Sequence, residues 1–381
     1  MVNRRQVLLV TNDLGPRAGG IESFILGLLG ELDGSNVVIF TSSQDGDTEF
    51  DRELAEDYGV IVHRDKARIL LPTPRVNRAV GELMEKYSSE IIWFGATAPL
   101  GWMSGYLKRK GAKRQVGLTH GHEVWWSKVW PFSWVLNRIS RNLDVITYLG
   151  DFTLRAMKPA LSPHVRTVQI APGIAVNHFT PGEANQELID TLNIKGKRTV
   201  ICVGRLVHRK GQDRLIEAMP KILQNQPDVV LILVGEGPRK NYLLKLVKKL
   251  NIENSVRFVG RLHFDELPLY LRVADLFAMP SRSRFFGLEV EGLGIVYLEA
   301  SAAGLSVLGG ASGGAPDAVL VGETGYVVDG GSVDAIAERV LSMLADPEGL
   351  HRMGARGRSW AVERWSWKIW GEKFKEVLFG E

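Results

Sequence analysis

Val200-Ile-Cys-Val-Gly-Arg-Leu-Val-His-Arg-Lys-Gly-Gln212 decides the fold class, because an apolar strand ends at Gly204 and a basic loop then leads into a helix. The end of a strand that feeds a helix is the place where an open α/β sheet binds its ligands. The loop carries Arg205, Arg209 and Lys210. Arg205 offers a planar fork of donors and Lys210 a mobile point charge, so together they can neutralise a diphosphate and stabilise it as a leaving group. Arg209 is expected to face solvent.

A second stretch, Glu291-Gly-Leu-Gly-Ile-Val-Tyr-Leu-Glu299, has a carboxylate on either side of a Gly-rich turn that opens an apolar helix. Gly292 and Gly294 let the backbone approach a ligand closely, so amides at the helix start can point at phosphate or sugar oxygens. Glu299 lies about two helical turns beyond Glu291 on nearly the same face, where a carboxylate accepts hydrogen bonds from a ribose diol. Two Glu at this spacing are common on solvated helices, but the glycines and the basic partners favour a sugar-nucleotide site.

Short β-rich runs alternate with helical patterns along the chain, which is typical of parallel sheets. The strands expected in a first sheet are Val7–Thr11, Val37–Phe40, Ile91–Phe94, Val116–Leu118 and Val145–Thr147. Those expected in a second sheet are Thr199–Val203, Val229–Val234, Val256–Val259, Leu276–Met279 and Val307–Leu308. The predicted fold class is therefore α/β with two Rossmann-like domains.

The domain boundaries follow from these two series of strands. A chain of 381 residues exceeds what one core usually organises, so two domains are expected. We assign residues 1–172 to an N-terminal domain and residues 173–360 to a C-terminal domain. Residues 361–381 form a last helix, for which Ser366 is a candidate cap and whose apolar residues recur at helical spacing.

The composition is that of an ordinary globular protein, with 45% hydrophobic and 24% charged residues and a net charge of +4. The single cysteine, Cys202, excludes an internal disulfide framework and is expected to be inert core within its strand. The apolar run near the N-terminus is too short for a signal sequence, and no apolar stretch approaches the length of a membrane span. A cytoplasmic location is expected.

A Gly-Gly turn follows the first strand of the chain. A loop leads through Gly19 and Gly20 into a helix that begins near Ile21. The amides of these glycines can approach a phosphate, although a tight turn needs glycine in any case. Asp13 has two possible roles, to form an Asx turn or to contact the substrate, and the turn is favoured.

Three stretches, Gly287–Ala300, Gly204–Gln212 and Thr11–Glu22, resemble the retaining family 4 glycosyltransferases of GT-B type, in which two Rossmann-like parallel sheets face a central cleft. Trp93–Leu100, Thr119–Glu123 and Ala311–Pro316 are similar to one branch, the GDP-mannose-dependent mannosyltransferases that act on phosphatidylinositol monomannoside. The similarity runs from about Val7 to Trp367. In such proteins the last helix crosses back to the first domain.

The resemblance implies retaining α-mannosyl transfer from GDP-mannose to a phosphatidylinositol mannoside, adding the second mannose to inositol O6 in an α-1,6 linkage. The departing β-phosphate, held by Arg205 and Lys210, would take the proton of the incoming hydroxyl on the same face. His120 would contact the transferred sugar, Glu291 would hold the sugar hydroxyls and Glu299 would hold the ribose. The donor contacts implied are Gly19, Gly20, Arg205, Lys210, Gly260, Arg261, Glu291, Gly294, Ile295, Val296 and Glu299.

Two patterns mimic metal sites. Thr119-His-Gly-His-Glu123 lacks a further cluster of zinc ligands, and Asp45-Gly-Asp47 lies in a polar loop that is better explained as a turn. His122 is expected to orient its loop. No metal and no other cofactor is therefore expected.

The segment from Trp102 to Arg141 contains five of the ten tryptophans and eight Lys/Arg, with Glu123 as its single acid. This composition suits the headgroup layer of an anionic bilayer. Trp125 and Trp126 cannot both face inward on a strand, so with Trp130 they are expected to contact the inner face of the cell membrane, and Asp13 is grouped with them on the acceptor side. The alternative is that the tryptophans are core and the basic residues a solvated face.

Other functions compete with this one. A family 4 enzyme with another nucleotide sugar or acceptor comes second, and a nonenzymatic nucleotide-sugar sensor, which would be expected to have lost Arg205, Lys210 or Glu291, is a distant third. A Rossmann dehydrogenase lacks its G-x-G-x-x-G signature here, and no nucleic-acid recognition motif occurs. For Phe285 and Phe286 two roles stay open, narrowing of the acceptor route or packing. No oligomeric state is predicted.

Overall fold

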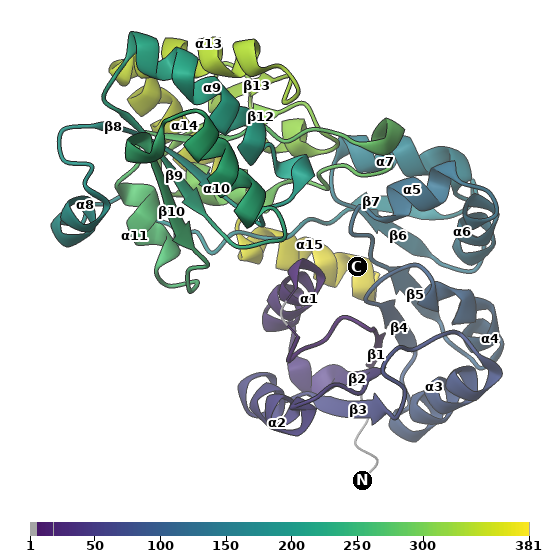
Figure 1. Cartoon of the computed structure of the whole chain (residues 1–381). Helices are drawn as coiled ribbons and strands as arrows, with labels where there is room; N and C mark the ends of the chain where they lie inside the picture. Colours follow the sequence, from purple (N-terminus) through teal and green to yellow (C-terminus); the bar gives the residue numbers. More distant parts are fainter. Residues whose placement is uncertain (1–5, 18, 381) are drawn as a thin grey trace. The chain divides into compact units, whose positions relative to one another are not determined.

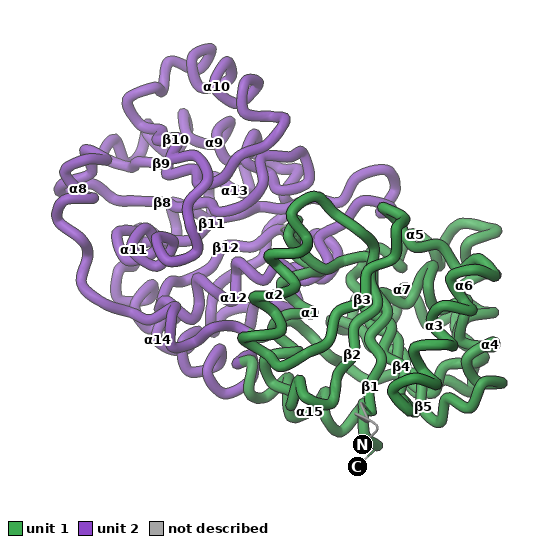
Figure 2. The backbone as a smooth tube through the Cα atoms, turned by 90° about the horizontal axis from the view of Figure 1, so that it is seen from below, with its two compact units in different colours: residues 1–173, 367–381 green, residues 174–366 purple. Residues whose placement is uncertain are grey.

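The structure is a computed structural model that describes residues 6–17 and 19–380. The chain forms two compact units, residues 1–173 with 367–381 and residues 174–366, which are coloured separately in Figure 2. The first division lies within one residue of the predicted boundary. The predicted junction at 360/361 falls inside α14 (Pro347–Arg364), and the chain passes to unit 1 after Ser366 instead.

Unit 1 contains a parallel sheet of seven strands in the order β3-β2-β1-β4-β5-β6-β7 (Figure 1). The strands are β1 (Val7–Val10), β2 (Val37–Ser42), β3 (Ile61–Asp65), β4 (Ile91–Phe94), β5 (Arg114–Gly117), β6 (Val145–Tyr148) and β7 (Arg166–Gln169). The order reverses between β1 and β4. That point is where a doubly wound sheet opens a crevice at the carboxyl ends of its strands.

Helices surround this sheet. The α-helices of unit 1 are α1 (Gly20–Gly30), α2 (Asp47–Tyr58), α3 (Pro74–Tyr87), α4 (Ser104–Arg109), α5 (Glu123–Lys128), α6 (Phe132–Ser140), α7 (Asp151–Met157) and α15 (Trp367–Phe379), and the 3-10 helices are η1 (Gly34–Asn36), η2 (Leu100–Met103) and η3 (Lys158–Ala160). The C-terminal α15 buries Phe374 against Trp93 of β4, with ring centroids 4.8 Å apart. Its apolar stripe therefore closes one side of the core of unit 1, as helical spacing predicts.

Unit 2 contains a second parallel sheet, of six strands in the order β10-β9-β8-β11-β12-β13. The strands are β8 (Arg198–Val203), β9 (Val229–Val234), β10 (Val256–Gly260), β11 (Leu276–Met279), β12 (Ser306–Gly310) and β13 (Gly325–Val328). The helices are α8 (Gln186–Leu192), η4 (His208–Lys210), α9 (Gln212–Asn225), α10 (Lys240–Lys249), η5 (Glu253–Ser255), α11 (Leu267–Arg272), η6 (Phe285–Gly287), α12 (Ile295–Ala302), η7 (Ala315–Ala318), α13 (Val333–Leu344) and α14. The order reverses between β8 and β11.

The predicted fold class, two parallel α/β domains of Rossmann type, is confirmed. All ten predicted strands occur, with ends that shift by one or two residues. Three strands were missed, β3, β7 and β13, and each lies at an edge of its sheet. The edge strands β3 and β7 carry charged residues, the ion-paired Arg64 and the exposed Arg166, so they lack the apolar run of a central strand.

Cys202 lies in the central strand β8 and is fully buried. Burial raises the pKa of its thiol to about 12, because the thiolate would lose its hydration. The thiol is therefore un-ionised at neutral pH and part of the core, as the sequence predicts.

Candidate active site

The carboxyl ends of β8, β9 and β10 are tied together in unit 2. Gly204 N–H donates to Val234 O over 3.0 Å, and Gly235 N–H donates to Gly260 O over 2.7 Å. The loop after β8 continues the contact, since Leu206 N–H donates to Glu236 O over 2.9 Å. The loops that leave these strands therefore start from one edge of the sheet, next to its switch point.

Lys210 and Glu291 meet at this edge. Lys210 Nζ lies 2.8 Å from Glu291 Oε2, and the two side chains are only 10% and 8% exposed. The backbone of Glu291 is fixed as well, because its N–H donates to Ser312 Oγ over 3.2 Å and its carbonyl accepts from Gly314 N over 2.8 Å. The structure thus brings together the loop lysine and the first carboxylate of the helix mouth, which the sequence separates by 80 residues.

Arg209 also turns toward Glu291, so the prediction that it faces solvent is wrong. Its Nε lies 3.8 Å from Glu291 Oε2, and its side chain is 30% exposed. The short helix η4 carries both neighbouring basic residues, and its tight turn directs them to the same carboxylate.

Gly211 explains how this loop packs against the end of β11. It has φ +77°, and a Cβ added there would lie 2.0 Å from Pro280 O. Arg282 N–H also donates to Arg209 O over 2.8 Å. The loop after β8 therefore rests directly on the chain that leaves β11, and only glycine fits at this contact.

The start of α12 is held by a buried tyrosine. Gly294 caps the helix with φ +81°, and a Cβ there would come within 2.4 Å of the Tyr297 ring. Tyr297 OH donates to Met279 O over 2.6 Å, and burial raises the pKa of this phenol. The half-buried Ile295 and Val296 follow in the first turn, whose amides a helix leaves without internal partners and which can bind an anion.

Glu299 belongs to the same group of charges. Burial raises the pKa of its carboxyl to about 7, while the charge of Lys210 acts in the opposite direction. Lys210 therefore lies close enough to influence both predicted carboxylates. The structure brings together three of the predicted residues, Lys210, Glu291 and Glu299.

Other predicted donor residues lie at the same edge without touching this group. Arg205 is exposed, and in the described part of the chain its guanidinium forms no ion pair. Gly260 ends β10, and Arg261 after it is exposed. The exposed side chains of Arg205 and Arg261 are available to a ligand, and neither forms an ion pair within the part of the chain that the structure describes.

Sequence reasoning missed a second polar network beside Lys210. Arg282 donates two hydrogen bonds to Asp213, of 2.8 and 2.7 Å, and Arg239 Nη2 lies 3.6 Å from the same carboxylate. Burial acts to raise the pKa of Asp213, but the hydrogen bonds and charge of Arg282 outweigh it and lower the pKa below its ordinary value. His208 contacts both arginines, and its pKa is lowered by burial and then by the charge of Arg239.

This network stiffens the loops around the site, because one carboxylate joins residues from three segments. A signal for it exists in the sequence. Gly235-Glu-Gly-Pro-Arg239 is a Gly-rich turn directly after the buried strand β9, and Arg282 follows another buried strand of the same sheet, β11.

In unit 1, His120 lies after β5 at the carboxyl edge of the sheet. Its Nε2–H donates to Gly95 O over 2.5 Å, and its N–H donates to Glu123 Oε2 over 3.0 Å. Burial lowers the pKa of His120, while Glu123 and Asp13 act to raise it. The imidazole is therefore neutral near pH 7. Asp13 lies close enough for its charge to act on His120, and its backbone N–H donates a hydrogen bond to Thr11 Oγ1.

His122 lies beside this pair. Its ring stacks on that of His120 with centroids 6.2 Å apart, and its Nε2 lies 3.2 Å from Oε1 of the buried Glu123. Phe24 packs against His120 in a T-shaped arrangement, at 5.6 Å between centroids. The position of His122 agrees with the expected role in orienting the loop.

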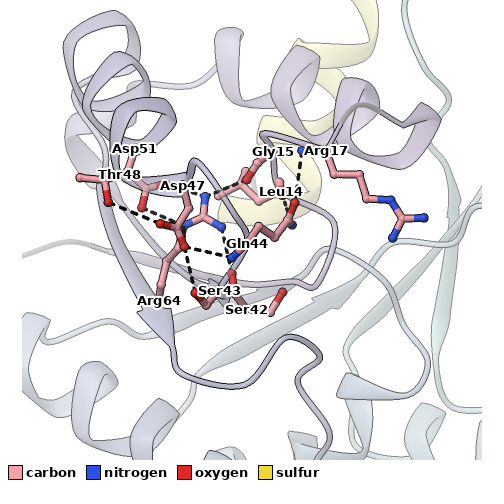
Figure 3. A network of polar contacts seen from close by, with 10 residues as sticks. All are labelled: Leu14, Gly15, Arg17, Ser42, Ser43, Gln44, Asp47, Thr48, Asp51 and Arg64. Carbon is pink, nitrogen blue, oxygen red and sulfur yellow. Dashed lines mark hydrogen bonds and ion pairs between the residues drawn. The ribbon is translucent and has the colours of Figure 1, made fainter.

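The loop before Gly19 is anchored by a polar network (Figure 3). Arg64 Nη2 donates to Gly15 O over 2.8 Å. Gln44 binds the loop at two points, because its Nε2 donates to Leu14 O over 2.6 Å and its Oε1 accepts from Arg17 N over 3.2 Å. Arg64 is held in turn by Asp51, 2.6 Å away. Two separate side chains therefore fix the start of this turn.

Gly19 and Gly20 differ in what their amides can do. Gly19 N–H donates to Glu22 Oε2 over 2.8 Å, so this amide is already used, and burial raises the pKa of Glu22 although that hydrogen bond acts to lower it. Gly20 begins α1 and is exposed, with open space where a Cβ would be. Of the two predicted phosphate contacts, Gly20 is the one that the local structure leaves accessible.

The tryptophan segment folds differently from the prediction. Trp125 and Trp126 lie on the helix α5, so the premise that they sit on a strand is wrong. Both rings pack on Phe132, at 4.8 and 5.1 Å, and Trp126 also packs against the core of unit 1. The exposed rings are Trp130 at 81%, Trp134 at 57% and Trp102 at 40%.

The aspartates of Asp45-Gly-Asp47 serve local structure. Asp47 Oδ2 accepts from Gln44 N over 3.0 Å at the start of α2, and Asp45 pairs with Arg68 at 3.2 Å. Within residues 6–17 and 19–380, no three His, Cys, Asp or Glu side chains gather as a metal site would require.

Phe285 and Phe286 are not packed in the core. They are 62% and 107% exposed, and both have positive φ, of 48° and 54°. The packing role is therefore wrong for this pair, and the strained turn in which they lie follows directly on Arg284, whose guanidinium lies 4.6 Å from the centre of the Phe285 ring.

The described residues contain no helix long and apolar enough to cross a bilayer.

Comparison with known proteins gives a consistent result. The family described as "Glycosyl transferases group 1" matches residues 185–360. The GDP-mannose-dependent alpha-(1-6)-phosphatidylinositol monomannoside mannosyltransferase of Mycolicibacterium smegmatis is 40% identical over 376 residues, which is 98% of each chain. The GDP-mannose-dependent monoacylated alpha-(1-6)-phosphatidylinositol monomannoside mannosyltransferase of Corynebacterium glutamicum is 39% identical over 380 residues, 99% of this chain and 98% of the other.

Among solved structures, that of Anabaena Alr3699/HepE in complex with UDP superposes with a TM-score of 0.81 at 19% identity, covering 99% of this chain and all of the other. At this identity the likeness concerns the fold alone.

Proposed function

Because the chain belongs to the group 1 family of glycosyl transferases, we propose that it transfers mannose from GDP-mannose to a phosphatidylinositol mannoside, with retention of the α configuration. The names of relatives that are about 40% identical over almost the whole chain support the donor and the acceptor. The single observation that carries the chemistry is the buried pair of Lys210 and Glu291, with 2.8 Å between its charged atoms.

In this proposal the site stabilises a leaving diphosphate. Lys210 has three donors, so it can keep Glu291 as a partner and still donate to a phosphate oxygen. Because it is already fixed, little reorganisation is needed when negative charge develops on the departing phosphate. Arg205, which has no carboxylate partner in the described chain, adds a bidentate contact to the same diphosphate. The first-turn amides of α12 supply further donors.

The carboxylates would hold the sugars. Glu291 accepts hydrogen bonds from hydroxyls of the transferred mannose, and Glu299 accepts from the ribose diol of the nucleotide. Gly260 and Arg261 border the base. No carboxylate is assigned as a nucleophile, since the β-phosphate oxygen takes the proton of the acceptor hydroxyl on the same face as the bond that breaks.

His120 would contact the mannose from unit 1. Its Nε2–H is used by Gly95 O, so Nδ1 and the backbone carbonyl remain as acceptors for a sugar hydroxyl or for developing positive charge. A neutral imidazole suits this position, because a charged one would oppose the oxocarbenium character of the transition state. Gly20 would meet the diphosphate.

We propose further that the transferred mannose is the second mannose of the glycolipid, joined α-1,6 to inositol O6 of the monomannoside. We also propose that the protein acts at the inner face of the cell membrane as a peripheral protein. The exposed Trp130 and Trp134 support this docking, because they extend from unit 1 beside the basic residues Lys128 and Arg138.

The proposal is tested by donor choice. The protein is incubated with radiolabelled GDP-mannose or UDP-glucose and purified phosphatidylinositol monomannoside, and the lipid product is separated by thin-layer chromatography. We expect label from GDP-mannose alone, in a dimannoside that an α-mannosidase cleaves. Transfer from UDP-glucose would replace the donor assignment with the alternative of another nucleotide sugar, and a β-linked product would overturn retention.

A further inference from the structure

A cavity in unit 1 is lined by none of the residues assigned to transfer. It has a volume of about 410 Å³ and lies between the start of α3, the segment of η2 and α4, and the end of α6. Three arginines line it, Arg109 at the end of α4, Arg138 in α6 and Arg141 directly after α6, and none of its lining residues is acidic. Three cationic residues thus line one hollow.

These charges are not neutralised by the protein. In the described chain, Arg109, Arg138 and Arg141 form no salt bridge, and Arg141 donates only to the neutral Asn137 Oδ1, over 3.1 Å. Like charges around one cavity repel each other, so an anion placed among them is favoured. Arginine is well suited to a phosphate, because its planar fork can donate two parallel hydrogen bonds.

One residue that lines the cavity carries an acceptor without a partner. Asn77, in the first turn of α3, lines it, and its Oδ1 is buried without a hydrogen-bond partner. A buried polar atom of this kind usually has a partner, so its natural complement here is a ligand that donates. A hydroxyl group is such a donor. The cavity is therefore complementary to a molecule that carries both a phosphate and hydroxyl groups.

Tryptophans at its rim indicate where that molecule comes from. Trp102 lines the cavity, and its ring lies 5.9 Å from that of Trp134, with 40% and 57% of the two residues exposed. Exposed indole rings beside arginines are typical of the interface between a bilayer and water. A soluble phosphate would need the arginines but would leave this apolar rim in water.

We propose that this cavity binds the phosphorylated polyol headgroup of an anionic phospholipid in the membrane, as a docking site distinct from the acceptor site. The three arginines hold the phosphate, Asn77 accepts from a headgroup hydroxyl, and Trp102 and Trp134 enter the interface beside it. The site deepens the proposed membrane docking, and it holds whether or not the transfer reaction is the one proposed.

Vesicle flotation with the full-length protein tests the site. Phosphatidylcholine vesicles contain equal mole fractions of either phosphatidylinositol or phosphatidylserine. The net charge of the two lipids is matched, and only phosphatidylinositol has a polyol headgroup. We expect tighter binding to phosphatidylinositol. Arg138→Gln with Arg141→Gln should weaken that binding about 25-fold, since each cation near an anionic surface contributes about fivefold. Asn77→Ala should abolish the preference for phosphatidylinositol while it keeps the charge-dependent binding.

The matched control is Arg78→Gln with Arg155→Gln, which removes the same charge from two exposed residues outside the cavity. It should leave the preference for phosphatidylinositol unchanged. Equal binding to the two anionic lipids by the wild type, or an unchanged preference in the cavity variants, would overturn the proposal. Thermal unfolding of each variant checks that the fold is retained.

One further measurement distinguishes a phospholipid headgroup from a soluble phosphate, and another distinguishes the cavity from the acceptor site. Inorganic phosphate and glycerophosphoinositol are titrated against tryptophan fluorescence. We expect glycerophosphoinositol to bind the wild type and not the Arg138/Arg141 variant, whereas equally tight binding of inorganic phosphate would assign the cavity to a soluble anion instead. Transfer with detergent-dispersed acceptor should stay within twofold in the cavity variants. If it is lost while vesicle binding persists, the cavity belongs to the acceptor site and the docking proposal is wrong.

Discussion

Lys210 Nζ lies 2.8 Å from Glu291 Oε2, and both side chains are at least nine-tenths buried. The two residues come from different switch-point loops of one sheet, one after β8 and the other after β11. The pair therefore fixes a cation and a carboxylate side by side at the place where a doubly wound sheet binds ligands. A charge held in this way needs no rearrangement to meet a phosphate, which is the basis of the first prediction.

Lys210→Ala should lower kcat for mannosyl transfer by about 10²–10³, the cost of removing one preorganised group that stabilises transition-state charge. Stopped assays with saturating donor measure this. Lys221→Ala is the matched control, because Lys221 lies on the exposed side of α9, where it pairs with Asp334 and Glu338. A kcat within threefold of wild type for Lys210→Ala would remove the lysine from the chemistry.

Glu299 should titrate near neutral pH. Its pKa is raised from 4.5 to about 7, so the folded protein keeps a proton that the unfolded chain loses, and this contribution to stability is lost as pH rises from about 4.5 through 7. Carbon-13 NMR of the labelled carboxyl should show the midpoint directly.

The same shift predicts a stability difference. Relative to Glu299→Gln, which cannot ionise, the wild type should lose about 3 kcal/mol of unfolding free energy between pH 4.5 and pH 8. Urea unfolding at several pH values measures the difference. A difference that stays constant with pH, together with an NMR midpoint below 5, would contradict the burial of this carboxyl.

Phe286 should destabilise its own turn. It has φ +54° and is completely exposed, so its side chain gains no packing to offset a left-handed backbone. Phe286→Gly should be more stable to urea than Phe286→Ala by about 1 kcal/mol, since both remove the ring and only glycine relieves the strain. Equal stabilities for the two variants would mean that the turn carries no such strain.

We expect Trp130 and Trp134 to contact the membrane. Trp126 packs against the core, so its replacement should also lower the stability of the fold. Trp130→Ser with Trp134→Ser should reduce flotation with anionic vesicles and leave the unfolding midpoint within about 2 °C, because both rings are largely exposed. Leu244→Ser on α10, an apolar residue of unit 2 that is 42% exposed, serves as the control. Unchanged flotation of the Trp130/Trp134 variant would sink the proposed docking through these rings.

The sequence predicts the parallel sheets well because central strands are continuous apolar runs. Arg64 and Arg166 interrupt the apolar pattern of the edge strands β3 and β7, and these strands were missed for that reason. At the site, Lys210 and Glu291 could be assigned to one ligand from the sequence, since each follows a recognisable strand or turn, but their ion pair was not predicted.

The orientation of single side chains could not be predicted. Arg209 turns toward Glu291 because of the local turn in η4, and Gly19 N–H is used by Glu22, three residues further on. Trp125 and Trp126 were placed on a strand because a six-residue helix such as α5 leaves too short a periodicity to recognise. The turn that carries Arg239 and the strand before Arg282 are recognisable in the sequence, but their meeting with Asp213 at the start of α9 depends on the tertiary fold.

The most direct test of the central claim compares acceptors. Purified protein, radiolabelled GDP-mannose and either phosphatidylinositol or phosphatidylinositol monomannoside are incubated under the same conditions, and the lipids are separated and counted. We predict a labelled dimannoside from the monomannoside and no labelled lipid from phosphatidylinositol. Label on phosphatidylinositol, or no label on either lipid while GDP-mannose binds, would contradict the proposed acceptor.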